Sequence, residues 1–222
     1  MSRQKEILEE LQTVITGKTL DALLPPLVFV LANGWLGLTG AIMGALGLSV
    51  VMMARRLIKK ESLKYSLGGF LGVAIASGLA YWTQNAANYF ISSAVTTGVL
   101  VLVAIITIVI DRPLALWASH LSRGWPMDWF MRADVKPAYR QVTWMWLLFF
   151  ILRLMAQVGG LIQGDATQLF WVNTILGWPV TVVVLIASYV YGIWKLNQLG
   201  GPGVEEFMQN KPQPWKGQTR GF

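Results

Sequence analysis

The chain has 222 residues, of which 55% are hydrophobic and 13% are charged, and its formal net charge is +7. These charged side chains are too few to cover the surface of a water-soluble domain of this length. The composition therefore predicts an all-α integral membrane protein. With no cysteine and a single histidine, disulfides and thiolate metal sites are excluded, and we expect neither a metal nor a cofactor. Because the basic residues lie beside apolar runs, we expect anionic lipid headgroups rather than nucleic acid to bind them.

Residues 1–19 predict an amphipathic leader on the cytoplasmic side. Its apolar residues recur at helical spacing, whereas its glutamates fall largely on the other face. We therefore expect this helix to lie on the membrane surface. The alternative is a solvated helix whose few apolar residues make no membrane contact.

Residues 20–195 contain repeated apolar runs that predict about six transmembrane helices. Pro25 and Pro26 must lie in the first turn of the first span or break it, which leaves that span complete, tilted or re-entrant. Gly177-Trp178-Pro179 should bend the last span. The expected spans are Leu20–Asn33, Trp35–Ala54, Ser66–Thr83, Tyr89–Ile110, Tyr139–Gly160 and Gln168–Trp194.

Basic residues are segregated between the two sets of connections. The short connections Asn33-Gly34, QNAAN and LIQGDA hold no lysine or arginine, whereas the other connections and both ends are basic. Arg153, inside the fifth span, is the exception. By the positive-inside rule both termini should be cytoplasmic.

The connection over residues 111–137 is rich in tryptophan and basic residues, a composition typical of a segment at the lipid headgroup layer. We expect it to lie along the cytoplasmic surface, as an anchoring belt or as a specific lipid site. The tail, residues 196–222, is rich in glycine and proline and predicts an extended cytoplasmic arm. The lipid or interface candidates are Trp117, His120, Arg123, Trp125 and Trp129.

Arg153 is the strongest candidate for a ligand-binding residue, because a guanidinium inside a bilayer needs a partner or water. Gln157 follows it by one helical turn, and polar residues of the neighbouring loops should lie at a similar membrane level. Two structural alternatives remain: Arg153 reaches outward toward Asp165, and the amides only cap helices. The candidates for an outward-facing polar pocket are Arg153, Gln157, Gln84, Asn88 and Asn173.

Glycines recur at helical spacing in the second and third spans, a pattern typical of close helix packing. Gly40-x-x-x-Gly44 suits a contact inside the chain or with a neighbouring chain, as do Gly68, Gly69, Gly72 and Gly78. No set of residues resembles a nucleophile with its base or a phosphate-binding loop, so we predict no catalytic residues and no enzyme activity.

Several segments resemble a family of bacterial six-span membrane proteins of unknown function and, more distantly, the intracellular septation protein A family. The resemblance extends from Leu23 to Leu196 and rests on LLPPLVFVLANGW, IVIDRPLALW, AYRQVTWMWLLFFILRLMAQ and WVNTILGWP. It implies a multi-pass protein of the bacterial cytoplasmic (inner) membrane, and the septation relatives imply a link to envelope biogenesis through protein partners. It implies no substrate and no site residues.

Three functional hypotheses follow from these observations. The first is a non-enzymatic scaffold or accessory subunit that binds other membrane proteins or a second copy of itself. The alternative is a small-solute or lipid transporter with its pocket around Arg153. An enzyme acting on lipids through Asp111, Asp128 and His120 comes third.

Overall fold

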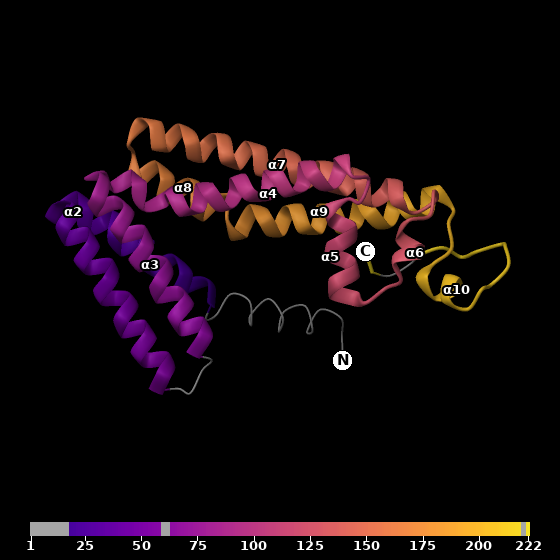
Figure 1. Ribbon diagram of the computed structural model, residues 1–222, viewed down its shortest axis with the longest axis horizontal. Coiled ribbons are helices and arrows are strands. Elements are labelled where there is room, and N and C mark those ends of the chain that lie inside the picture. Colours follow the sequence, from indigo (N-terminus) through magenta and orange to yellow (C-terminus); the bar gives the residue numbers. More distant parts are fainter. Residues whose placement is uncertain (1–17, 59–62, 219–220) are drawn as a thin grey trace. The chain divides into compact units, whose positions relative to one another are not determined.

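The computed structural model describes residues 18–58, 63–218 and 221–222, with the side chains of 18–22 and 63–66 left aside. The predicted leader, residues 1–19, lies almost entirely outside this part. All regular structure in the described residues is helical (Figure 1). The elements are α2 (Lys18–Ile58), α3 (Leu63–Thr83), η1 (Ala86–Phe90), α4 (Ile91–Val109), α5 (Leu114–Arg123), α6 (Met127–Phe130), α7 (Lys136–Gln163), α8 (Ala166–Ile175), α9 (Trp178–Leu199) and α10 (Val204–Met208).

Helix α2 consists of two helical arms joined at Gly37, where φ is 69° and ψ is −175°. Only glycine adopts such a conformation without strain, since it has no Cβ. The predicted break at Asn33-Gly34 is therefore wrong: those residues are helical, and the chain turns three residues later. Pro25 and Pro26 lie inside the first arm, neither in its first turn nor at a break, as membrane helices tolerate where neighbours satisfy the freed backbone groups.

The described residues divide into two compact units, and the first comprises residues 18–58, 63–95 and 156–178. Its core joins both arms of α2 to α3, η1 and α8, and the ring of Phe29 stacks on Tyr89 with centroids 4.1 Å apart. A Cβ added to Gly44 would lie 3.1 Å from Val28 Cγ1. The predicted close packing at Gly40-x-x-x-Gly44 therefore occurs inside the chain, between the arms of α2.

The second unit comprises residues 96–155 and 179–222. Its main core is aromatic and joins α5, α6, the start of α7, the end of α9 and the tail. Trp129, Phe130 and Tyr139 are completely buried there. The indole of Trp129 donates a hydrogen bond to the carbonyl of Pro202 at 2.8 Å, which satisfies its only polar atom.

The last predicted span is interrupted where the sequence predicts a bend. Helix α8 ends at Ile175 and α9 begins at Trp178. Pro179 is the second residue of α9, a position where its missing N–H costs no helical hydrogen bond.

The tail is packed rather than extended, contrary to the prediction. The carboxylate of Glu206 accepts hydrogen bonds from the backbone N–H groups of Gly203, Lys216 and Gly217 at 2.8–3.1 Å. The ring of Phe222 stacks on Tyr139 with centroids 4.2 Å apart. The hydrogen bonds of one carboxylate and the stacking of one ring thus hold the tail in place, although the tail has few apolar residues.

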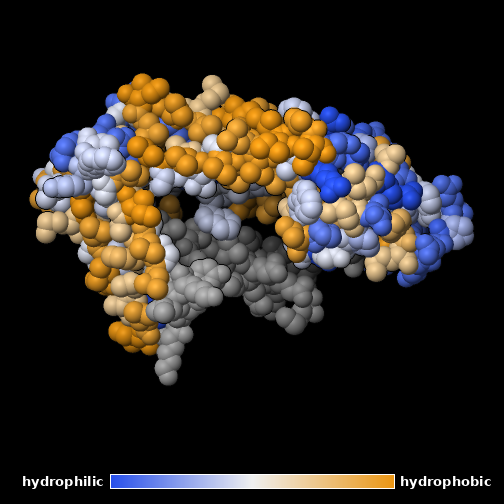
Figure 2. Space-filling model, in the orientation of Figure 1, coloured by the Kyte–Doolittle hydropathy of each residue, from blue (hydrophilic) through white to orange (hydrophobic). Residues whose placement is uncertain are grey.

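Within the part of the chain that the structure describes, four helical segments are long and apolar enough to cross a membrane, and a shorter apolar helix covers Leu67–Thr83. The four are Leu23–Ile58, Ala86–Val109, Lys136–Gln163 and Ala166–Leu199. In the second unit, hydrophobic surface over α4 and α7 gives way to hydrophilic surface around α10 (Figure 2). These features are those of a membrane-spanning protein.

Substitution of Gly37 by alanine should destabilise the protein by about 1–3 kcal/mol, because alanine resists the positive φ that the turn of α2 requires. An added Cβ meets nothing within 4 Å, so the effect is conformational. Thermal unfolding in detergent measures it. The control is Gly34→Ala, which also meets no atom within 4 Å but lies in helical backbone. Equal melting temperatures for the two variants would contradict the assigned turn.

Candidate functional site

Three polar side chains meet inside the first unit, on α4, α7 and α8. Gln157 is completely buried, and its Nε2 donates to Asn173 Oδ1 at 2.8 Å and to Ser93 Oγ at 3.0 Å. Ser93 Oγ donates to the same Asn173 oxygen at 2.5 Å. The Asn173 amide donates in turn to the carbonyl of Leu169 at 2.8 Å. Each pair in this polar trio, Ser93, Gln157 and Asn173, shares a hydrogen bond.

The carbonyl oxygen of Gln157 is the exception within the polar trio. It is buried and has no hydrogen-bond partner among the described residues. An unpaired buried acceptor costs about 1–3 kcal/mol. The polar trio therefore has one acceptor, Gln157 Oε1, that a further donor such as a water molecule or a hydroxyl group could satisfy.

The structure brings together Gln157 and Asn173, as the sequence predicts, but the other predicted pocket residues make different contacts. Gln84 is exposed, and its Nε2 donates to the carbonyl of Tyr81 at 2.6 Å. Asn88 is half-buried in η1. Arg153 belongs to the second unit, and its Nε is buried without a hydrogen-bond partner in the described part of the chain.

Some loop residues have the capping role that the sequence left open. The side chain of Asn85 accepts from the backbone N–H of Ala87 at 2.9 Å and begins η1. Asp165 accepts from the N–H of Gln168 at 2.9 Å and begins α8.

Ser93 is a member of the polar trio that the sequence analysis missed. The only signal for it is the pair of hydroxyl residues Ser92-Ser93 inside an apolar span.

The predicted lipid-interface residues form a compact structure among themselves. His120 Nδ1 lies 2.7 Å from the carbonyl oxygen of Trp125, and the guanidinium of Arg123 lies 4.9 Å from the centre of a Trp125 ring. Trp117 is half-buried. Trp129 is completely buried, so its indole is not available to lipid headgroups. The connection over residues 111–137 thus contributes part of its side chains to the protein core instead of to the lipid surface.

Ion pairs join the end of α4 to the start of α7. The ammonium of Lys136 bonds Asp111, and Arg140 lies 3.9 Å from the same carboxylate. The hydrogen bond from Lys136 lowers the pKa of Asp111, against a smaller opposing effect of desolvation. Nearby, Arg132 binds Asp134 with two hydrogen bonds of 2.7 and 2.8 Å. These carboxylates are occupied by cations of the chain itself.

In the described ranges, no three histidine, aspartate or glutamate side chains come together in a group that could hold a metal ion. The polar trio contains no group that titrates near neutral pH. Its chemistry is hydrogen bonding to a neutral polar group.

A comparison with protein families matches residues 16–195 to a family described as "Protein of unknown function (DUF3159)". The chain belongs to the DUF3159 family. This match confirms the predicted membership in a family of unknown function and covers nearly all of the predicted helical region. No curated protein and no solved structure matches the chain. Within the DUF3159 region lie all members of the polar trio.

Substitution of Asn173 by leucine should destabilise the protein by about 1–2 kcal/mol, because it removes the acceptor shared by Gln157 and Ser93. Thermal unfolding in detergent measures the effect. Gln163→Leu is the matched control, since that amide is exposed at the end of α7. If Asn173→Leu melts no lower than Gln163→Leu, the polar trio does not stabilise the first unit.

Proposed function

We propose that this protein is a non-enzymatic scaffold or accessory subunit that binds another membrane helix through one face of α3. The observation that carries this proposal is an exposed glycine pair, Gly68 and Gly72. At either position, no atom of the described residues lies within 4 Å of an added Cβ. Small residues four positions apart let a second helix approach closely in lipid. The neighbouring Leu71 and Ile75 are 54% and 59% exposed and extend the contact face.

The glycines of α2 provide an internal comparison. Gly44 is occupied from within the chain, since its added Cβ would meet Val28 and Ala32 at 3.1 and 3.8 Å. The same small-x-x-x-small spacing thus brings the two arms of α2 together, whereas in α3 no described residue packs against Gly68 or Gly72. Ala76 and Ala80 follow Gly72 by one and two turns on the same side of α3 and are buried in the unit. The core therefore covers the C-terminal half of this side, and the Gly68–Gly72 half is exposed for a partner.

The absence of enzyme activity is part of the proposal. Its support is that Asp111, Asp134 and Glu206 each bind groups of the chain itself. Catalytic carboxylates instead need open contact with a substrate.

The proposed orientation has six crossings, with both termini on the cytoplasmic side of a bacterial inner membrane. Its support is the turn at Gly37, which divides α2 into two arms, together with the alternation of basic and non-basic connections. The distant resemblance to the septation protein A family favours envelope biogenesis as the process that the partner serves.

A small-solute or lipid transporter is the second candidate. It is favoured by Arg153, whose buried Nε lacks a partner in the described residues, because polar groups in lipid must be satisfied by protein, water or ligand. A transporter would work as a solitary protein, whereas a subunit would not. Association in cells therefore separates the two candidates.

The test is cross-linking in cells at native abundance, followed by purification in mild detergent. The wild-type chain should yield a reproducible adduct, either with another membrane protein or with a second copy. Gly72→Leu should reduce that adduct to background, because the leucine side chain keeps a partner helix from close approach.

The control is Gly98→Leu, on α4, whose added Cβ also meets no atom within 4 Å but has no glycine partner four residues away. It should leave the adduct unchanged. A wild-type protein that is consistently solitary would overturn the proposal, and so would an adduct that survives Gly72→Leu.

A further inference from the structure

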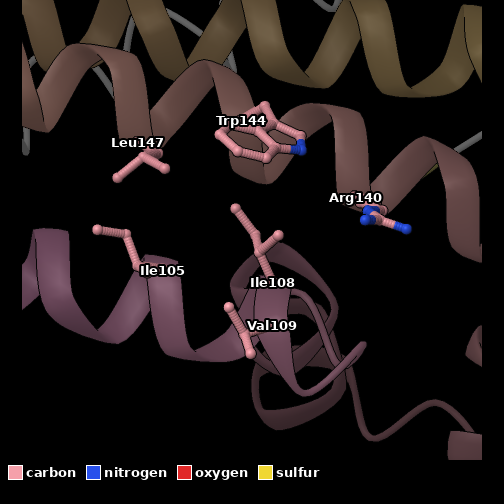
Figure 3. Close-up of a pocket in the computed structure, with 6 residues that line it drawn as sticks. All are labelled: Ile105, Ile108, Val109, Arg140, Trp144 and Leu147. Atoms are coloured by element: carbon pink, nitrogen blue, oxygen red, sulfur yellow. The ribbon is translucent and has the colours of Figure 1, made fainter.

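A small groove lies in the second unit between α4 and α7. It has a volume of about 250 Å³ and is lined by Ile105, Ile108 and Val109 of α4 and by Arg140, Trp144 and Leu147 of α7. Figure 3 shows the two sets of side chains facing each other across the gap, with Arg140 at one end. Five of the six lining residues are apolar or aromatic, and both helices are long and apolar enough to cross a membrane.

The periodicity of α7 produces this arrangement. Arg140, Trp144 and Leu147 are four and three residues apart, so they share one face of the helix. They cover about 10 Å along the helix axis, at a rise of ~1.5 Å per residue. Polarity along the groove therefore changes from a cation, through an indole, to an aliphatic side chain. A phospholipid has the same order, from phosphate through glycerol to hydrocarbon.

The charges at the Arg140 end favour an anion. Lys136 holds Asp111 by a direct hydrogen bond, and Arg140 approaches the same carboxylate only to 3.9 Å. Two cations thus share one carboxylate, and a net positive charge remains. The guanidinium of Arg140 is half-exposed and has donors that Asp111 does not use. Bidentate hydrogen bonding to a phosphate suits such a group.

We propose that this groove binds one anionic phospholipid, with its phosphate at Arg140 and a length of acyl chain between Ile105 and Leu147. The volume is below the roughly 300–1,000 Å³ of ordinary small-molecule sites, which fits a section of one chain and not a whole lipid. Trp144, 52% exposed, lies between the two ends, where an indole prefers the boundary of headgroup and hydrocarbon. This site is separate from the α3 face and does not depend on it.

The experiment is native mass spectrometry of the full-length protein, released from nanodiscs made of equal amounts of phosphatidylglycerol and phosphatidylcholine. The wild-type protein should retain phosphatidylglycerol preferentially. Arg140→Gln should lower that preference by about tenfold, as expected for the loss of a charge-assisted hydrogen bond. Arg55→Gln is the matched control, because Arg55 is an exposed arginine in the last turn of α2. It makes the same change of charge outside the groove and should retain the wild-type preference.

The acyl-chain half of the site is tested by filling the groove. Ile105 and Val109 are 40% and 76% exposed, so Ile105→Trp and Val109→Trp should fold, which thermal unfolding verifies. Ile105→Trp should lower the retention of both lipids. Equal losses in Arg140→Gln and Arg55→Gln would show nonspecific attraction and overturn the proposal. Wild-type retention in both tryptophan variants would also overturn it.

Discussion

The structure depends on one constraint: a polar group inside a bilayer has no water to bond and must find its partner in the protein. The helices satisfy the backbone. Side chains satisfy most of the rest, as where Gln157, Ser93 and Asn173 bond one another within the first unit. Burial inside the protein places the same demand on Trp129, whose indole donates to the carbonyl of Pro202. Gln157 Oε1 and Arg153 Nε are among the buried atoms that have no partner in the described residues.

Glycine determines how closely helices approach in this fold. At Gly37 it supplies the backbone conformation that turns α2 back on itself, and at Gly44 it leaves room for Val28 of the opposing arm. At Gly68 and Gly72 the same small surface has no occupant among the described residues. Because lipid gives helices no hydrophobic reason to associate, a close-packing surface left open is most simply explained by a partner helix. The groove beside Arg140 differs from the Gly68–Gly72 face because it carries a positive charge. That charge favours an anionic lipid over an apolar helix as the proposed occupant.

The sequence predicts long apolar elements better than irregular ones. The predicted spans Ser66–Thr83 and Tyr139–Gly160 lie within α3 and α7, because apolar length is a local property of the chain. The turn of α2 was misplaced at Asn33-Gly34, since two glycines three residues apart are equally able to turn and only packing selects Gly37. The folded tail was missed because its order comes from distant partners: Glu206 with backbone groups, and Phe222 with Tyr139. Ser93 was missed for a related reason, since its partners lie 64 and 80 residues away.

The proposed topology has six crossings, with the basic connections on the cytoplasmic side. Because it has no cysteine, single cysteines at Gly34, Gln163, Ser122 and Lys216 would each report one position. The measurement is labelling of intact cells with a thiol reagent that cannot cross the inner membrane. Cysteines at Gly34 and Gln163 should be labelled, whereas those at Ser122 and Lys216 should react only after the membrane is opened. Labelling of Ser122→Cys in intact cells, or protection of Gly34→Cys, would contradict the six-crossing account.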